Sequence, residues 1–325
     1  MRIRRLAAVA AVLAAGSASA YVRETTVPGH PDQGYWLWWN SRSIGYRVNA
    51  TGSLQYPAPC GDTSGSTFQT AVDNAFAAWK PDKSDLRFYA GPTTTNTAVG
   101  NDGMNLVVYR AGTCVGVAPT GDACFRTAGL CAKLYNCWEH GNTGNAETLA
   151  LTTTTFDLDT GEILDADIEY FGWDGYPAPG HGMVMTCGGT AVCSVTPGYD
   201  QPYGTSSGCN WIDVGTLTMH EAGHMLGLDH ECQYGAPYDP PSPPGSCPTD
   251  SVMNPQIDPG YVLPFVPDVD LAAISSVYPT GKPAVTDNPP PPKKGGCASA
   301  GAGELGPLAL LALAAFPAWR RRRTW

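Results

Sequence analysis

The sequence predicts one domain in which β-strands and α-helices are mixed, flanked at both ends by segments of different composition. Two observations predict the mixture: apolar residues alternate in some stretches and recur every three or four positions in others. A third observation, a set of closely grouped cysteines, is typical of a protein in an oxidising compartment. Of the 325 residues, about 260 remain for the folded part, which is enough for a substantial core.

Hydrophobic periodicity predicts the first elements. Residues 35–49 alternate between apolar and polar side chains, which predicts a strand with one buried face. That face comprises Ile44, Tyr46 and Val48. Apolar residues in 66–80 recur at helical spacing, which predicts a helix that Ser66 caps and Pro81 ends. The apolar stripe of this helix comprises Phe68, Val72, Ala75, Phe76 and Trp79.

Further strands and helices are predicted along the rest of the chain. Short strands are expected at 86–89 and 105–109, and two longer strands at 149–156 and 163–170. The turn-forming residues 157–161 join the longer pair. Helices are expected at about 213–226 and 269–278. Two stretches rich in cysteine and small residues predict loops, at 111–147, where we expect disulfides, and at 172–209.

Both ends of the chain have the composition of targeting segments. Residues 1–20 combine early arginines, an apolar stretch and a small-residue cleavage site, which is typical of a secretory signal peptide. Residues 284–296 are rich in Pro, Gly and Lys and predict an extended linker. Residues 297–325 hold Cys297, a short apolar run and an arginine cluster. We therefore expect an exported domain at 21–283, followed by a linker and an anchoring tail.

Charge and cysteine content narrow the functional classes. Residues 21–292 hold ten Lys and Arg against 28 Asp and Glu, so this body is acidic. An acidic body cannot neutralise a run of phosphates, which argues against a nucleic-acid partner. Ten of the 11 cysteines lie between Cys60 and Cys247. An even set in an exported domain predicts up to five disulfides.

Three histidines in and just after the helix predicted near residue 220 have the spacing of ligands to one metal ion. His220 and His224 are four positions apart, so a helix presents both imidazoles on one face. Gly227 tolerates the positive φ that reverses the chain and returns His230 to the same ion. Three nitrogen ligands leave a fourth position open, as a catalytic zinc site requires. Glu221 is expected beside the metal, as a general base rather than a ligand.

This pattern resembles that of the metzincin zinc metallopeptidases, and residues 226–230 resemble the matrixin branch. Further stretches resemble this family in the order that the family uses. They are 75–79, 160–168, 251–255 and 268–279. The resemblance covers about 35–280 and implies that Met253 lies beneath the zinc ligands.

The resemblance implies an α+β fold with a twisted, mostly parallel sheet and helices, followed by a small irregular C-terminal subdomain. It places a substrate cleft between about 35–227 and 228–283. It implies a zinc-dependent endopeptidase that acts on proteins or peptides, in which Glu221 accepts a proton from a zinc-activated water. Two alternatives stay open: a catalytically idle zinc-binding adhesion or interaction module at the cell surface, and an esterase or amidase for small substrates.

Other side chains could bind additional metal ions. Calcium could take oxygen ligands from Asp157, Asp159, Asp165 and Asp167. Turns and solvated strand edges use such residues more commonly. A second, structural zinc would require the fold to bring together several of the remaining histidines, which are His30, His140 and His181.

The tail from Gly296 resembles the C-terminal sorting tag of myxobacterial surface proteins, through Cys297, the short apolar run and the terminal arginines. This resemblance implies processing near Cys297 and anchoring of the mature protein to the membrane or cell surface. An ordinary transmembrane helix is the alternative. Residues 305–319 are few for a bilayer span, which favours the sorting tag.

Overall fold

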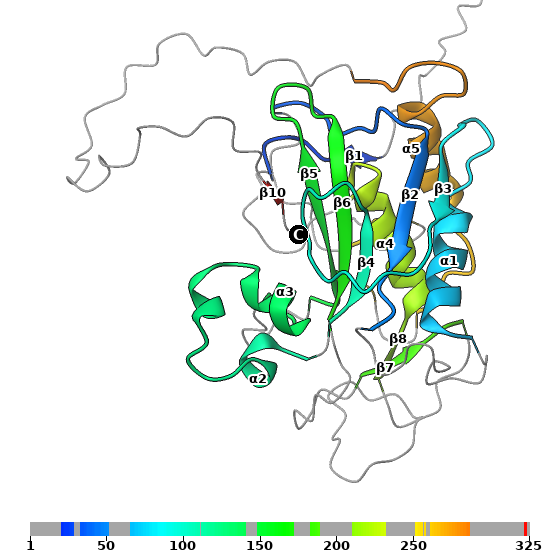
Figure 1. The fold of residues 1–325 in the computed structure, drawn as a ribbon. Coiled ribbons are helices and arrows are strands. Elements are labelled where there is room, and N and C mark those ends of the chain that lie inside the picture. The colour runs from blue at the N-terminus through cyan, green and yellow to red at the C-terminus, as the bar shows by residue number, and fades with distance from the viewer. Residues whose placement is uncertain are drawn as a thin grey trace, which may run out of the picture.

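The computed structural model describes residues 21–28, 33–51, 66–110, 112–140, 148–171, 183–188, 210–231, 251–255, 257, 261–286 and 322–323. In this part of the chain the largest sheet has the strand order β10-β5-β6-β4-β2-β3 (Figure 1). Its strands are β2 (Ser43–Val48), β3 (Arg87–Ala90), β4 (Leu106–Tyr109), β5 (Ala150–Phe156), β6 (Ile163–Tyr170) and β10 (Arg322–Arg323).

The sheet is mostly parallel, as expected. β2 pairs in parallel with β3 and with β4, and β4 pairs in parallel with β6. β5 is antiparallel to β6, and the turn at residues 157–161 joins these two strands as predicted. The fold is therefore α+β with a mostly parallel sheet.

Three helices longer than two turns accompany the sheet in the described residues. They are α1 (Phe68–Ala78), α4 (Val214–Met225) and α5 (Asp268–Val277). α1 and α4 pack against each other and against strands of the sheet (Figure 1). The predicted cap of α1 is one residue too early, because the Thr67 side chain, not that of Ser66, accepts a hydrogen bond from the N–H of Thr70. Either residue type is a good cap, so composition alone does not separate them.

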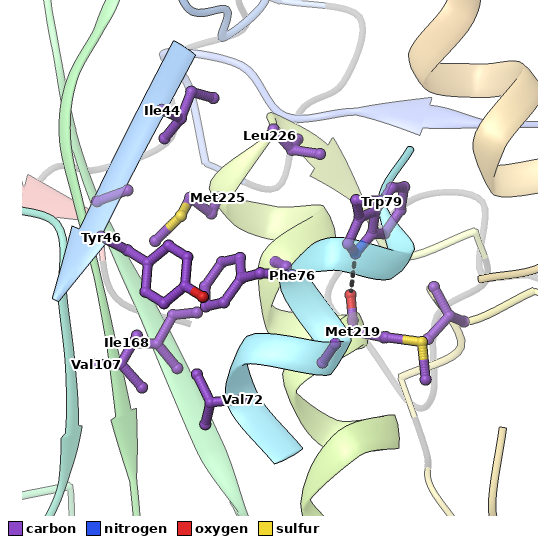
Figure 2. Close-up of a cluster of buried hydrophobic side chains, with 14 of the residues drawn as sticks. Ile44, Tyr46, Val72, Phe76, Trp79, Val107, Ile168, Met219, Met225 and Leu226 are labelled. Atoms are coloured by element: carbon purple, nitrogen blue, oxygen red, sulfur yellow. Dashed lines mark hydrogen bonds between the residues drawn. The ribbon is translucent and has the colours of Figure 1, made fainter. Parts of the chain in front are cut away.

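The core lies between the sheet and the α1–α4 pair, and it contains the side chains that periodicity predicts. Tyr46 of β2 stacks on Phe76 of α1 with ring centroids 4.0 Å apart. Figure 2 shows both rings with Val107 and Ile168 of the sheet and Val72 of α1. Burying each large apolar side chain stabilises the fold by about 1.5–3 kcal/mol.

Residues 112–140, here called the excursion, lie between β4 and β5 in the sequence. It contains α2 (Cys114–Val117), the 3-10 helix η1 (Ala123–Arg126) and α3 (Leu130–Tyr135). Two disulfides, Cys114–Cys137 and Cys124–Cys131, close it, which confirms the predicted cross-linking of this stretch. The excursion lies apart from α1, α4 and α5 (Figure 1). Cys187 is also disulfide-bonded, whereas the predicted pairing of Cys60 lies outside the described residues.

Two small sheets flank the main one. β7 (Met183–Thr186) pairs in parallel with β8 (Asn210–Asp213), and β1 (Val22–Arg23) pairs antiparallel with β9 (Leu228–Asp229). β7 lies in the stretch 172–209 that the sequence predicts as a loop, and that prediction is wrong for these four residues. Such a short strand forms through its pairing with β8, whose residues lie 27 positions further along the chain, and its own periodicity gives no signal.

Several sequence predictions fall on residues that the structure does not describe. These are the signal peptide at 1–20, the linker beyond residue 286, and Cys297 with the apolar tail. Ala284 still packs on the core, and the N–H of Val285 donates to the carbonyl of Val277, so the chain follows the domain to at least this point. Among the described residues no helix combines the length and the apolar character needed to cross a membrane.

Candidate metal centre

Helix α4 holds two of the three histidines and is fixed at both ends. At its start, the Asp213 carboxylate accepts a hydrogen bond from the N–H of Thr216 at 2.8 Å. At its end, the indole N–H of Trp39 donates to the Met225 carbonyl at 2.7 Å. The Tyr278 hydroxyl donates to the Leu226 carbonyl at 2.9 Å. These partners satisfy backbone groups that a helix end leaves without intrahelical bonds, so the ligand-bearing face is held in place.

A turn at Gly227 brings the third histidine back to the helix, as the spacing predicts. Gly227 has φ 87°, in the left-handed region that favours glycine. The turn passes close to a neighbouring segment, since a Cβ at this position would lie 2.6 Å from the carbonyl oxygen of Leu37. Strand β9 follows the turn and leads directly into His230.

Replacement of this glycine tests the importance of the turn. We expect Gly227→Ala to lower the free energy of unfolding by more than the strain of one positive φ, which is about 1–3 kcal/mol. The added methyl group overlaps the Leu37 backbone, and relief of that overlap moves His230. Gly121→Ala is the matched control, because Gly121 has φ 86° and open space around its Cβ position. Chemical denaturation and zinc titration would measure both variants, and equal losses in the two would contradict the expectation.

The three histidine side chains converge through their Nε2 atoms. The distances are 3.1 Å between His220 and His224, 3.2 Å between His224 and His230, and 3.2 Å between His220 and His230. The Nδ1 atom of His220 lies 2.7 Å from the Val252 carbonyl, and that of His224 lies 2.9 Å from the Leu228 carbonyl. A carbonyl only accepts, so in His220 and His224 the Nδ1 atom carries a proton, and Nε2 is the ring atom that faces the common centre.

This arrangement fits a tetrahedral zinc ion. Zinc–nitrogen bonds of about 2.0–2.1 Å at tetrahedral angles place ligand nitrogens about 3.3–3.4 Å apart, close to the distances observed. Lone pairs that face one another repel unless a cation lies between them. His220, His224 and His230 are the only group of three potential ligand residues found among the described residues. A four-coordinate ion bound by these three nitrogens would take one further ligand.

The electrostatic surroundings of the two buried helix histidines differ. Burial lowers the pKa of His220 to about 3, which keeps this imidazole neutral and able to bind a metal. Burial opposes the charge on His224 as well, but the carboxylates of Glu24, Glu221 and Asp229 outweigh it and raise the pKa to about 9. Carboxylates that favour a proton at this imidazole also favour a metal cation beside it.

Glu221 lies on α4 beside the ligands and is itself buried. Its Oε2 atom accepts a hydrogen bond of 2.6 Å from the hydroxyl of Thr152 on β5. Burial raises the pKa of Glu221 above its ordinary value, and the nearby His224 and Thr152 moderate the rise. A carboxylate with a raised pKa is suited to accept and return a proton near neutral pH. Thr152 cannot be predicted from the sequence, because a single threonine in a strand of threonines carries no local signal.

Residues 251–255 pack against α4 and are held in place by α5. Asp270 of α5 accepts hydrogen bonds of 2.8 Å from the hydroxyl of Ser251 and from the N–H of Val252. The carbonyl of Val252 in turn faces His220. Met253 packs so closely on α4 that a Cβ at Gly223 would overlap its sulfur atom. Met253 thus lies against α4 at Gly223, between His220 and His224 in the sequence.

Two of the four candidate calcium ligands, Asp157 and Asp167, accept hydrogen bonds from the backbone. Asp157 accepts hydrogen bonds from the N–H groups of Asp159 and Thr160, which forms the turn before β6. Asp167 accepts from the N–H groups of Gly100 and Leu106. These hydrogen bonds give Asp157 and Asp167 structural roles in holding the backbone.

Of the three candidate histidines for a second zinc ion, only His140 lies among the described residues. The Nε2 atom of His140 lies 3.3 Å from Glu169. His30 and His181 lie outside the described residues. A second zinc site therefore has no support within the described part of the chain.

Comparison with known proteins adds no relatives to these observations. No protein-family model matches the sequence, and the search of curated proteins finds no significant match. The function is therefore argued from the site itself.

Proposed function

We propose that this protein is an exported zinc metalloendopeptidase of the metzincin type, anchored at the cell surface by its C-terminal tail. The observation that carries the proposal is the convergence of the three histidine Nε2 atoms on one point, within 3.2 Å of one another. The spacing suits zinc, and the open fourth position suits catalysis. A buried carboxylate, Glu221, lies on the same helix, as hydrolysis requires.

In the proposed mechanism the residues of the chain handle the protons. His220, His224 and His230 would hold a zinc ion, which would supply Lewis acidity for activating water and polarising the scissile carbonyl. Glu221 accepts the proton of the attacking water and delivers it to the nitrogen of the leaving amine. Thr152 donates to Glu221 and so orients the carboxylate while it changes its protonation state.

Metal analysis and proteolysis together test the proposal. We expect the purified protein to bind about one zinc ion per chain through three histidines and to cleave casein. A zinc chelator should abolish cleavage, and added zinc should restore it. Zinc binding without cleavage of casein or of a mixed peptide library would instead indicate the adhesion module. Hydrolysis restricted to small esters would indicate the esterase.

A further inference from the structure

The first described residues of the chain run alongside the metal centre. β1 pairs with β9, with Val22 opposite Asp229 and Arg23 opposite Leu228. The N–H of Glu24 then donates to the carbonyl of Gly227 at 2.9 Å. Strand β1 and Glu24 therefore run beside the turn and the strand that lead to His230. Two segments about 200 positions apart in the sequence meet at this point.

This N-terminal segment is fixed from its other side as well. Arg23 is buried and donates to the carbonyl of Leu37 at 2.8 Å and to that of Val285 at 2.6 Å. The carbonyl of Glu24 accepts from the N–H of Leu37 at 2.9 Å. The backbone of Glu24 is thus hydrogen-bonded on both sides, and its side chain has a defined direction.

That side chain reaches a metal ligand. Glu24 is fully buried, and its Oε1 atom lies 3.2 Å from Nδ1 of His224. The Leu228 carbonyl accepts from the same Nδ1 at 2.9 Å. Two acceptors at Nδ1 hold the ring in one orientation and direct the Nε2 lone pair to the metal. A carboxylate at this place also increases the electron-donating strength of the imidazole.

We propose that Glu24 is a positioning residue of the metal centre, whose carboxylate orients His224 and tightens metal binding. The segment 21–26 that carries Glu24 is on this view part of the site. The inference rests on the proposed zinc site but does not require that the site be catalytic.

Charge balance supports the same assignment. Three neutral imidazoles leave the charge of a divalent cation uncompensated in a buried site. A buried carboxylate is costly unless a cation or a strong donor compensates it. Glu24 and a zinc ion at His224 compensate each other through the imidazole, which explains why an acid is buried at this position.

Zinc affinity in substituted full-length protein tests the proposal. We expect about a tenfold loss of affinity for Glu24→Gln, which retains the reach and an acceptor oxygen, and a loss of up to about 100-fold for Glu24→Ala. Competition with a chromogenic chelator measures the affinity. Glu162→Gln is the matched control, because Glu162 is partly exposed in the turn before β6 and is expected to leave the affinity unchanged.

Thermal unfolding with and without zinc separates positioning from a general structural role. A structural role lowers the melting temperatures of the zinc-free and zinc-bound forms equally. A positioning role narrows the gap between them, because zinc then stabilises the folded variant less. Glu24 variants that bind zinc as tightly as the wild type, with an unchanged gap, would overturn the inference. If the wild type binds zinc but cleaves nothing, the proposed function fails and the affinity test of Glu24 still stands.

Discussion

Glu221→Gln is expected to keep its zinc and its fold while losing about 10²–10⁴-fold or more of the peptidase activity. Glutamine has the shape of glutamate, and its carbonyl oxygen can still accept the hydrogen bond from Thr152. It cannot take a proton from water at neutral pH. The reaction therefore loses its base, whereas the three histidines stay in place.

Casein cleavage and zinc content, measured on the same preparation, check this expectation. Glu162→Gln serves as the matched control, since it removes a carboxylate from a partly exposed turn and should cleave at the wild-type rate. A Glu221→Gln protein with a full complement of zinc and wild-type activity would refute the role of Glu221. Loss of zinc from this variant would instead mean that Glu221 contributes to metal binding.

The parts of the fold that the sequence predicts are those specified by local patterns. The alternation at Ile44, Tyr46 and Val48 and the stripe along α1 each arise from one face of one element, and all of these side chains are buried. β1, β7 and β9 were not predicted. Each is two to four residues long and depends on a partner elsewhere in the chain, so no local periodicity precedes it.

The candidate site also has one part that a local pattern predicts and another part that only tertiary contacts reveal. Its three histidines share a spacing that a helix and a glycine turn explain, so they are predictable from one short stretch. Glu24 and Thr152 reach the site from β-structure that is distant in the sequence, and Asp270 reaches it from the last helix. A single polar residue in a strand or helix has many ordinary roles, and only the tertiary contact distinguishes these three.

A buried ion pair between Arg110 and Glu169 joins the disulfide-closed excursion to the sheet. Arg110 is 1% exposed, and its Nε donates to Glu169 Oε1 at 2.7 Å. Its Nη1 also donates to the carbonyl of Ala132 in the excursion at 3.2 Å and to that of Thr97 at 2.9 Å. Burial alone would raise the pKa of Glu169, but Arg110 and His140 outweigh burial and hold this pKa below its ordinary value.

Arg110→Met is therefore expected to lower the free energy of unfolding by about 3–5 kcal/mol, because it leaves Glu169 charged and buried without its partner. Arg126→Met is the matched control: Arg126 is exposed on η1, and its loss should change stability by no more than about 0.5 kcal/mol. Adding Glu169→Leu to Arg110→Met should recover much of the loss, since no buried charge then remains. Urea denaturation would measure all three.

The pH dependence of stability gives a second readout of this ion pair, and its sign is definite. A folded-state pKa below the unfolded value means that Glu169 stabilises the fold above its unfolded pKa of about 4.3 and loses this contribution as the pH falls. The stability difference between the wild type and Glu169→Gln should thus narrow below about pH 4. A difference that is constant from neutral to acidic pH, together with a small effect of Arg110→Met, would show that the pair does not hold the excursion to the sheet.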